Sequence, residues 1–236
     1  MKILETLLLI FVTFLPPILY AFWIRNTEKF NREKWIPIIL CFIWGATIAV
    51  IASIILELIL HFSIAPSIGD ANIMALITII ILAPFVEEFT KPLILGFKIV
   101  KKELDEIEDG LIFGAVTGLG FSATENLLYG TKFMTYGLII FIVLIFFRSF
   151  GACLLHASAT AWTGYGYGKT IMKHSRLIQV LPYFLMAVFV HAFYNSFLSF
   201  EIPGALTGLF AALALASITI ILIRKKIRVL DEISGP

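Results

Sequence analysis

Two adjacent carboxylates and an ammonium lie inside a long apolar run of the sequence. Glu87, Glu88 and Lys91 fall between Ile73 and Val100, a stretch long enough to cross a lipid bilayer. On a helix, Lys91 is four residues from Glu87 and three from Glu88, so one lysine can bridge both acids. A charge at bilayer depth costs roughly 3 kcal/mol on insertion scales, so such groups indicate a functional site. A salt bridge that only fixes helix packing would have the same spacing.

Proline residues bracket this charged group. Pro84 and Pro92 lack a backbone N–H, and each leaves a carbonyl one turn earlier without its helical partner. Broken helix at membrane depth is tolerated where the backbone lines a cavity or is buried in protein. The two prolines therefore predict that the acidic pair faces a polar cavity inside a helical bundle.

Polar side chains interrupt three later apolar runs, each within about 8 Å of the middle of its run. These side chains are Glu125 with Asn126, Arg148 with His156, and His191 with Asn195. One cavity shared by four helices explains all of these interruptions at a single depth. A structural interpretation also exists for each, because polar side chains often join neighbouring membrane helices and Glu125 can pair with Arg148 or Lys91.

These residue types suit the hydrolysis of an amide. A carboxylate in a desolvated pocket can accept a proton from water and later return it to a leaving amine. No Ser or Cys has an obvious basic partner, and Cys41 and Cys153 lie within apolar runs. We therefore expect water to be the nucleophile, with Glu87 as its general base. His191 and Asn195 share one helix face and are suited to donate hydrogen bonds to the oxyanion.

The remaining polar residues are expected to support this chemistry. Glu88 and Lys91 tune and position Glu87, while Glu125 and His156 complete the cavity. Glu57, near the outer end of the second run, can reach water and is assigned no role. The expected catalytic residues are Glu87, Glu88, Lys91, Glu125, His156, His191 and Asn195.

No cofactor is expected, and zinc is the alternative. In that case His156, His191 and a carboxylate, Glu125, would be the ligands. No His-Glu-x-x-His pair is present, and the two histidines lie on different runs.

The composition indicates the fold that must position these residues. The 236 residues are 60% hydrophobic and 14% charged, which is typical of a polytopic membrane protein rather than a soluble domain. Seven apolar runs are near the length of about 20 residues that a spanning helix needs. They cover 3–24, 36–60, 73–98, 110–130, 138–168, 178–200 and 204–224. We expect one transmembrane domain over 1–236, an all-α bundle of seven helices, or eight if the overlong fifth run divides.

Basic residues are unevenly distributed between the runs. The first, third and fifth connections and the C-terminal tail hold clusters of Lys and Arg. The second and sixth connections hold none, and the fourth holds only Lys132. Because basic connections stay in the cytoplasm, this pattern predicts a cell-membrane protein with its N-terminus outside and its C-terminus inside.

The third connection has a pattern of its own. Apolar residues recur on one side of residues 99–109 while acidic residues face away, which predicts a short amphipathic helix at the cytoplasmic interface. Asp109-Gly110 then forms the start of the fourth spanning helix, with Asp109 near its N-terminus. Glycines at Gly114, Gly118 and Gly120, and again at 164–168, indicate close helix approach.

Four motifs in this order resemble the PrsW family of intramembrane proteases, within the superfamily of CAAX-prenyl and bacteriocin-processing proteases. They are the acidic pair with its lysine (Glu87–Lys91), the Asp109-Gly110 entry that leads into a Gly-Phe-x-x-x-Glu-Asn stretch (Gly120–Asn126), the stretch from Arg148 to His156, and His191–Asn195. The resemblance covers residues 80–200, the expected catalytic core. It implies proteolysis of a membrane-anchored protein, which in bacterial relatives is the first extracytoplasmic cut in an anti-sigma factor.

We therefore expect an intramembrane endopeptidase whose partners are a membrane-anchored protein substrate and the lipid bilayer, with no nucleic acid. A zinc peptidase at the same residues is one alternative. A proton-coupled transporter or channel is another, because buried acids and histidines also build proton relays. A non-catalytic membrane scaffold with the same fold is the third.

Overall fold

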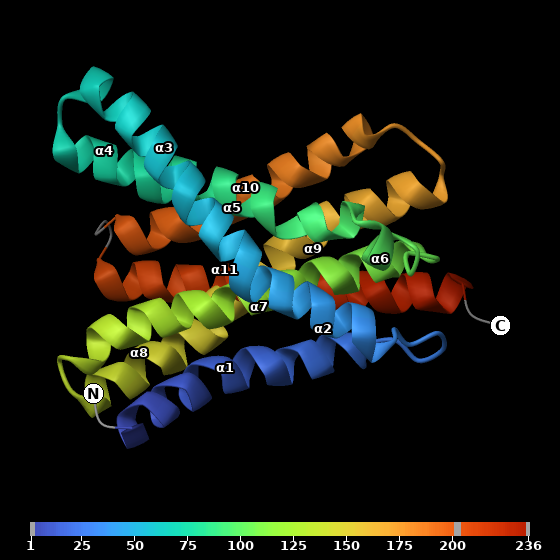
Figure 1. Cartoon of the computed structure of the whole chain (residues 1–236), viewed down its shortest axis with the longest axis horizontal. Coiled ribbons are helices and arrows are strands. Elements are labelled where there is room, and N and C mark those ends of the chain that lie inside the picture. Colours follow the sequence, from blue (N-terminus) through green and yellow to red (C-terminus); the bar gives the residue numbers. More distant parts are fainter. Residues whose placement is uncertain (1–2, 201–203, 235–236) are drawn as a thin grey trace.

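The computed structural model describes residues 3–200 and 204–234, and it is helical through most of its length (Figure 1). Among these residues, seven helical stretches are long and apolar enough to cross a membrane. They are Ile3–Arg25, Trp35–Ile68, Ala71–Gly96, Ile107–Met134, Leu138–Met172, Leu177–Ser199 and Ala205–Ser234. The expected all-α polytopic fold is therefore confirmed, and each stretch overlaps the apolar run predicted for it.

Several stretches are divided into shorter helices. The second consists of α2 (Trp35–Trp44), the π-helical turn η1 (Gly45–Ala49) and α3 (Val50–Ile68). The third consists of α4 (Ala71–Ile77), the π-helical turn η2 (Thr78–Leu82), α5 (Ala83–Thr90) and the 3₁₀ turn η3 (Lys91–Gly96). The fifth consists of α8 (Leu138–Phe150) and α9 (Ala152–Met172). The other elements are α1 (Ile3–Arg25), α6 (Lys98–Lys101), α7 (Ile107–Met134), η4 (Leu177–Val180), α10 (Leu181–Ser199) and α11 (Ala205–Ser234).

The helices α7 and α9 form the centre of the bundle and pack closely along their length. A Cβ added at Gly110, Gly114 or Gly118 of α7 would collide with the backbone of α9. Small residues at this spacing allow two backbones to approach, as the glycine pattern predicts. The close contact places His156 of α9 beside Glu125 of α7, so the packing itself assembles part of the polar group.

Irregular helix surrounds the acidic pair, as its flanking prolines predict. Pro84 is the second residue of α5, which begins where η2 ends, and Pro92 lies within η3. Between these two turns, α5 is only eight residues long and carries Glu87 and Glu88. Local π and 3₁₀ turns are common at functional sites, because they re-aim side chains and free backbone groups.

The fifth stretch is interrupted at Gly151, where φ is −98° and ψ is −80°. A Cβ at this position would meet the hydroxyl of Tyr194 and the carbonyl of Phe147, so the close approach favours glycine. The break explains why the apolar run is overlong, and it separates Arg148 of α8 from His156 of α9 while keeping both inside the bundle.

The segment before α7 differs from the amphipathic helix expected over residues 99–109. Only α6 is helical there, and residues 102–106 form turns and non-helical backbone. The start of α7 explains the difference. The side chain of Asp109 accepts hydrogen bonds from the N–H groups of Asp105 (2.8 Å) and Glu106 (2.6 Å), and forms a capping box with Glu106. Asp109 therefore caps the helix N-terminus as expected, and by doing so ends the shorter helix earlier.

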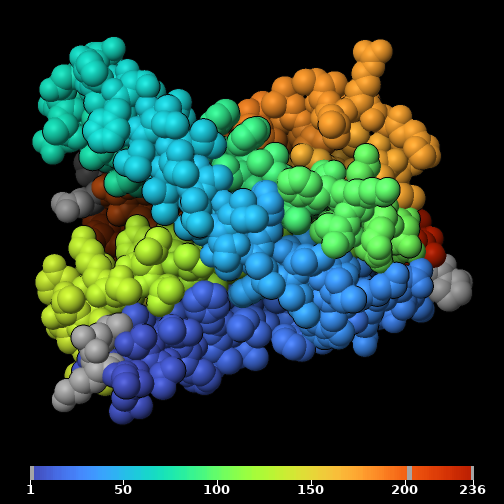
Figure 2. All heavy atoms as spheres, in the orientation of Figure 1, coloured from blue at the N-terminus to red at the C-terminus, as the bar shows by residue number. Residues whose placement is uncertain are grey.

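The two ends of the bundle carry different connections. Figure 1 places the α1–α2 connection, α6 and the α9–α10 connection at the end where the chain finishes, and the N-terminus at the opposite end. The basic clusters of the sequence therefore gather at one end of the molecule. At the other end the α3–α4 hairpin stands apart from α7 and α8, and Figure 2 shows a recess between them.

Candidate active site

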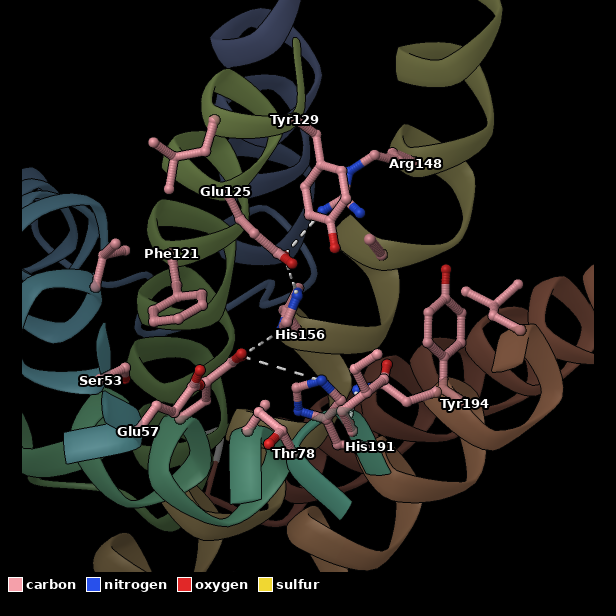
Figure 3. Close-up of a pocket in the computed structure, with 18 of the residues that line it drawn as sticks. Ser53, Glu57, Thr78, Phe121, Glu125, Tyr129, Arg148, His156, His191 and Tyr194 are labelled. Carbon is pink, nitrogen blue, oxygen red and sulfur yellow. Dashed lines mark hydrogen bonds and ion pairs between the residues drawn. The ribbon is translucent and has the colours of Figure 1, made fainter. Parts of the chain in front are cut away.

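A cavity of about 430 Å³ lies inside the bundle, between α3, η2, α5, α7, α8, α9 and α10 (Figure 3). The residues expected to be catalytic divide into two groups. Those lining the cavity are Glu87, Glu125, His156, His191 and Asn195. Glu88 and Lys91 are fully buried directly behind them. The structure therefore brings all of the expected residues into one region.

Lys91 is the centre of the charged network. Its Nζ donates hydrogen bonds to Glu87 Oε2 (3.0 Å), Glu88 Oε1 (2.8 Å) and His156 Nδ1 (2.8 Å). The same ammonium lies 4.3 Å from the centre of the Phe121 ring, a cation–π distance. One lysine thus bridges both acids, as the helical spacing predicts, and it also holds a histidine from α9.

The two adjacent acids have different surroundings. Glu88 is 0% exposed, and its carboxylate accepts hydrogen bonds from Lys91, from Thr160 Oγ1 (2.9 Å) and from His191 Nδ1 (3.0 Å). Glu87 is 8% exposed, lines the cavity and bonds Lys91 through one oxygen. Glu88 is therefore an internal acid with its acceptors in use, whereas Glu87 keeps acceptor capacity that faces the cavity.

Glu125 stands between a histidine and an arginine (Figure 3). Its Oε2 accepts a hydrogen bond from His156 Nε2 (2.7 Å) and lies 2.8 Å from Arg148 Nη2. Arg148 in turn donates from Nε to Asn126 Oδ1 (2.7 Å), and its guanidinium lies 4.1 Å from the centre of the Tyr129 ring. The sequence leaves two alternatives for Glu125, a pair with Arg148 or a place in the cavity wall. In the structure Glu125 has both.

Asn195 of α10 is bonded to the irregular backbone of η2. At the end of this turn the N–H of Ala83 bonds the carbonyl of Thr78, five residues earlier. The next residue, Pro84, has no N–H, so the carbonyl of Ile79 lacks its partner in the same register. The side-chain amide of Asn195 donates one hydrogen to this carbonyl (2.8 Å) and keeps a second hydrogen for the cavity that it lines.

The partners of the two histidines assign their protons. An ionised carboxylate only accepts hydrogen bonds, so His156 donates from Nε2 to Glu125 and His191 donates from Nδ1 to Glu88. The opposite nitrogens, His156 Nδ1 and His191 Nε2, then carry lone pairs and lie 3.8 Å and 4.0 Å from Glu87 Oε2. The 4.0 Å between Glu87 Oε2 and His191 Nε2 is a separation at which one water can donate a hydrogen bond to each.

A family model described as PrsW family intramembrane metalloprotease matches residues 33–223, which include every residue of this site. The chain belongs to this family. A curated relative, Protease PrsW of Clostridioides difficile (strain 630), is 30% identical over 122 residues, or 51% of this chain. The aligned part covers 50% of that relative, so the chain matches about half of its length. No solved structure matches the chain.

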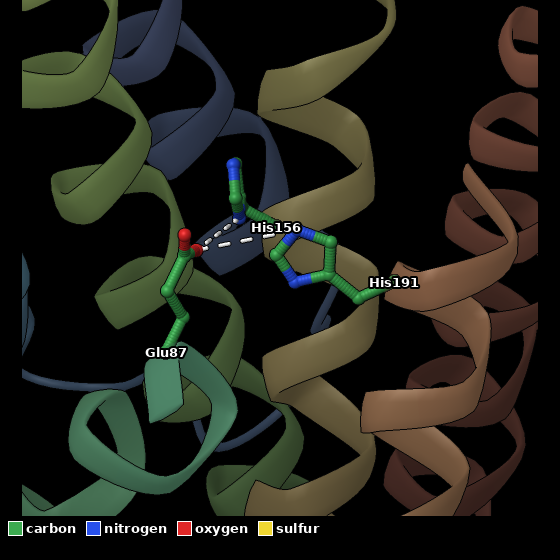
Figure 4. Close-up of side chains that lie close together, drawn as sticks. All are labelled: Glu87, His156 and His191. Carbon is green, nitrogen blue, oxygen red and sulfur yellow. Dashed lines mark ion pairs between the residues drawn. The ribbon is translucent and has the colours of Figure 1, made fainter. Parts of the chain in front are cut away.

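The family's description as metalloproteases directs attention to one group of donor atoms. Glu87, His156 and His191 each offer one atom within 4.8 Å of the other two (Figure 4). Two imidazoles and a carboxylate suit zinc, and a carboxylate holds the far nitrogen of each ring, as at many zinc sites. The donor types therefore fit, with Glu87 in the place that the sequence suggests for Glu125. Lys91 opposes the fit, because its ammonium already bonds His156 Nδ1 and Glu87.

Some residues of the site are absent from the sequence prediction. Glu57 of α3, to which the sequence assigns no role, lines the cavity. Thr160 anchors Glu88, and its position four residues after His156 on the same helix face is a signal that could have found it. Tyr129 lines the cavity beside Arg148 and is four residues from Glu125, which is again helical spacing.

Proposed function

We propose that this chain is an intramembrane endopeptidase that hydrolyses a peptide bond of a membrane-anchored protein with water activated by Glu87. One observation carries the proposal. Of the two adjacent acids, Glu87 lines the cavity, and its Oε2 lies 4.0 Å from the lone-pair nitrogen of His191. Membership of a family of intramembrane proteases supports the reaction class.

The proposed reaction begins with water held between Glu87 and His191. Attack on the scissile carbonyl forms a C–O bond, moves one proton from water to Glu87, and places negative charge on the former carbonyl oxygen. The free N–H of Asn195 stabilises this oxyanion. When the C–N bond breaks, Glu87 returns the proton to the leaving nitrogen, and the products are a carboxylic acid and an amine.

This assignment changes the role expected for His191. The sequence suggests a hydrogen-bond donor to the oxyanion, as for Asn195. Because Nδ1 of His191 donates to Glu88, the neutral ring has a lone pair at Nε2 and is suited to hold the attacking water. Glu88 and Lys91 act as positioning residues, since Lys91 joins both acids and Glu88 orients the ring.

Zinc-assisted hydrolysis at the same cavity is a second candidate, favoured by the family's description and by the cluster of donor atoms. Glu87, His156 and His191 would hold the ion, which would supply Lewis-acid polarisation of a carbonyl or a more acidic water. His191 would still be oriented by Glu88, and His156 by Glu125. Lys91 would have to release His156 Nδ1, because that lone pair is engaged.

The cavity is suited to a substrate that arrives from the lipid. Its wall includes apolar side chains of α3, α7 and α10, among them Ile54, Leu128 and Leu198. Only Val50 and Ser53 of α3 are buried, so most of this helix is exposed, and it borders the recess in Figure 2. We therefore expect the substrate to reach the cavity from the lipid, through the space between α3 and α8. A carbonyl inside a regular helix is already hydrogen bonded, so cleavage requires a locally unwound substrate.

Orientation in the membrane is part of the same proposal. The basic connections favour a cytoplasmic C-terminus and an outer N-terminus. The cavity reaches from Glu87 towards Tyr129 and Ser199, near the helix ends on the N-terminal side, so the cut would fall in the outer half of the bilayer. Single cysteines at Ser67 and Lys132 should react with an impermeant thiol reagent from outside. Labelling of Lys101→Cys from outside would reverse the orientation.

The function is tested by incubating the purified chain in lipid nanodiscs with candidate single-span proteins and mapping new termini by mass spectrometry. We expect one cut inside or beside the spanning segment, made faster by Gly or Pro at the site. Equal turnover of a soluble unfolded protein would contradict the proposed substrate class. Proton-driven solute uptake into liposomes, without cleavage of any tethered protein, would favour a transporter.

A further inference from the structure

A second group of buried carboxylates lies at the end of the bundle where the chain finishes. Glu28 and Glu33 belong to the α1–α2 connection, and Asp109 lies in the first turn of α7. One oxygen of each carboxylate lies within 4.8 Å of the other two. The residues are 0%, 7% and 1% exposed, respectively. Acids that lose their contact with water need either protons or positive charge.

Protein cations do not provide that charge. Among the described residues, no Lys, Arg or His forms an ion pair with these three carboxylates, and the ion pairs of this end involve Glu103 and Glu232. The neighbouring arginines bind backbone instead. Arg25 Nε donates to the carbonyl of Glu33 (2.6 Å), and Arg32 Nε donates to the carbonyl of Glu28 (2.9 Å). The connection is thus folded so that its guanidinium groups do not neutralise its acids.

One carboxylate oxygen has no partner at all within the part of the chain that the structure describes. Glu28 Oε1 is buried and accepts no hydrogen bond, while Oε2 accepts a long bond from the N–H of Glu33 (3.3 Å). A buried acceptor without a partner loses its hydration and gains nothing in return, so it points to a ligand that the protein itself does not supply.

A shared proton is the simplest rival to a metal ion. Burial, followed by the charge of Asp109, raises the pKa of Glu28 to about 8 and that of Glu33 to about 11. Without a cation, these carboxyls therefore hold protons at neutral pH. A cation that displaces the protons would meet three anionic oxygens in one place.

We propose that Glu28, Glu33 and Asp109 bind a hard divalent cation, Mg²⁺ or Ca²⁺, which ties the α1–α2 connection to the start of α7. Carboxylate oxygens are the ligands that these ions prefer, and the absence of His or Cys from the group distinguishes it from the cavity. A solvent-open cavity of about 630 Å³ borders Glu33, together with acidic and basic side chains of the same end, and it leaves room for water beside this ligand.

The surrounding contacts indicate what the ion would hold together. Asp231 of α11 accepts hydrogen bonds from the N–H groups of Lys29 (2.8 Å) and Phe30 (3.3 Å), and Asn31 donates to Glu106 Oε1 (2.8 Å). The connection is therefore already attached to α11 and to the residue that caps α7. A bound cation would add the one attachment that neutralises its buried acids, independently of the chemistry in the cavity.

The experiment uses the full chain in detergent, stripped with EDTA and then given Mg²⁺, Ca²⁺ or Mn²⁺ separately. At a hundredfold excess over Kd, we expect the unfolding temperature to rise by roughly 5–10 °C. We also expect about one tightly held Mn²⁺ per chain by electron paramagnetic resonance, as the three-ligand site requires. Comparison of the Mg²⁺ and Ca²⁺ midpoints then identifies the preferred ion.

Matched variants locate the effect. Glu28→Gln and Glu33→Gln keep the side-chain size, cannot offer the ion an anionic oxygen, and should abolish both the shift and the bound Mn²⁺. Glu103→Gln, which alters a half-buried acid at the same end that pairs with Lys34 and Lys102, should retain both. The response should also persist in His191→Ala, which separates this site from the cavity. No shift in the wild type with any of the three ions, or undiminished binding in both glutamine variants, would overturn the proposal in favour of shared protons.

Discussion

The cavity and the connection end of this bundle both bury several carboxylates, but they neutralise them differently. Beside the cavity, Lys91 lies within 3.0 Å of two acids and Arg148 lies 2.8 Å from a third. At the connection end, Glu28 and its two neighbours have no such partner among the described residues, and one oxygen stays unbonded. Buried carboxylates are thus neutralised by Lys and Arg side chains in one region, and by protons or metal ions from solution in the other.

This difference separates permanent from adjustable charge. A lysine at the end of the short helix that carries its two acids holds them in one geometry whatever the solution contains, which suits a site that must aim a base at a carbonyl. A site of acids alone changes its occupancy with protons and metal ions. Mutations should therefore be most damaging in the first region, and changes of solution in the second.

The largest effect is expected from Glu87→Gln. The amide keeps the shape of the side chain and can still bond Lys91, but it cannot take a proton from water. We expect kcat to fall by about 10²–10⁴-fold, the range for loss of a general base. The measurement is the initial rate of appearance of the new terminus, normalised to folded protein.

Glu88→Gln is the matched control for that variant. Glu88 is enclosed by Lys91, Thr160 and His191, so its loss should act through the position of the ring and reduce kcat less. If the two acids share one proton and titrate as a pair, both variants will lose activity equally. If Glu87→Gln cleaves at the wild-type rate, Glu87 is not the general base.

The next effect is on stability. Lys91→Met leaves two buried carboxylates without their cation, and breaking a buried pair in this way costs about 3–5 kcal/mol of unfolding free energy. With metal ions removed by EDTA, Glu28→Gln should be neutral or stabilising, because it replaces a buried carboxyl oxygen that has no protein partner. Chemical unfolding of the two variants in the same detergent compares the regions directly. If Lys91→Met is as stable as the wild type, Lys91 does not stabilise the carboxylates of Glu87 and Glu88.

Asn195→Ala is expected to lower kcat by about 10²–10³-fold, the scale for loss of one oxyanion donor, with a smaller change in KM. The variant also leaves the carbonyl of Ile79 without its hydrogen bond. If Asn195 were only structural, the variant would be less stable but would not lower kcat more than it changes KM. Asn195→Gln, which can restore a donor to one of the two positions, should recover part of the rate. Full activity in Asn195→Ala would exclude the oxyanion role.

Much of the cavity follows from local sequence rules. Apolar runs longer than 20 residues define the spans, and helical spacing alone places Lys91 against both acids. The glycines of α7 indicate close helix approach but not the partners, since Gly114 and Gly118 meet α9 whereas Gly120 meets Phe42 of α2. The exact place of the break in the fifth run is less predictable, although Gly151 there lies against the Tyr194 hydroxyl of another helix.

The remaining features depend on contacts between distant segments. The helix expected over 99–109 is cut short because Asp109 caps α7, a competition that the amphipathic pattern does not contain. The role of His191 changes because Glu88 fixes its proton, and the spacing to Asn195 gives no sign of this. Glu28 and Glu33 meet Asp109 across the fold, so no local motif marks the connection end.

The smallest effect on activity is expected from removing metal ions. Lys91 already supplies positive charge to Glu87 and His156, so strong chelators should leave the rate of cleavage unchanged. The same treatment should lower the unfolding temperature, because it empties the connection end. Loss of activity together with one equivalent of zinc, and recovery when zinc is returned, would instead establish the zinc-assisted reaction. Repeating the chelation on Glu28→Gln assigns the change: its unfolding temperature should no longer respond, whereas a catalytic zinc would still be stripped from Glu87, His156 and His191.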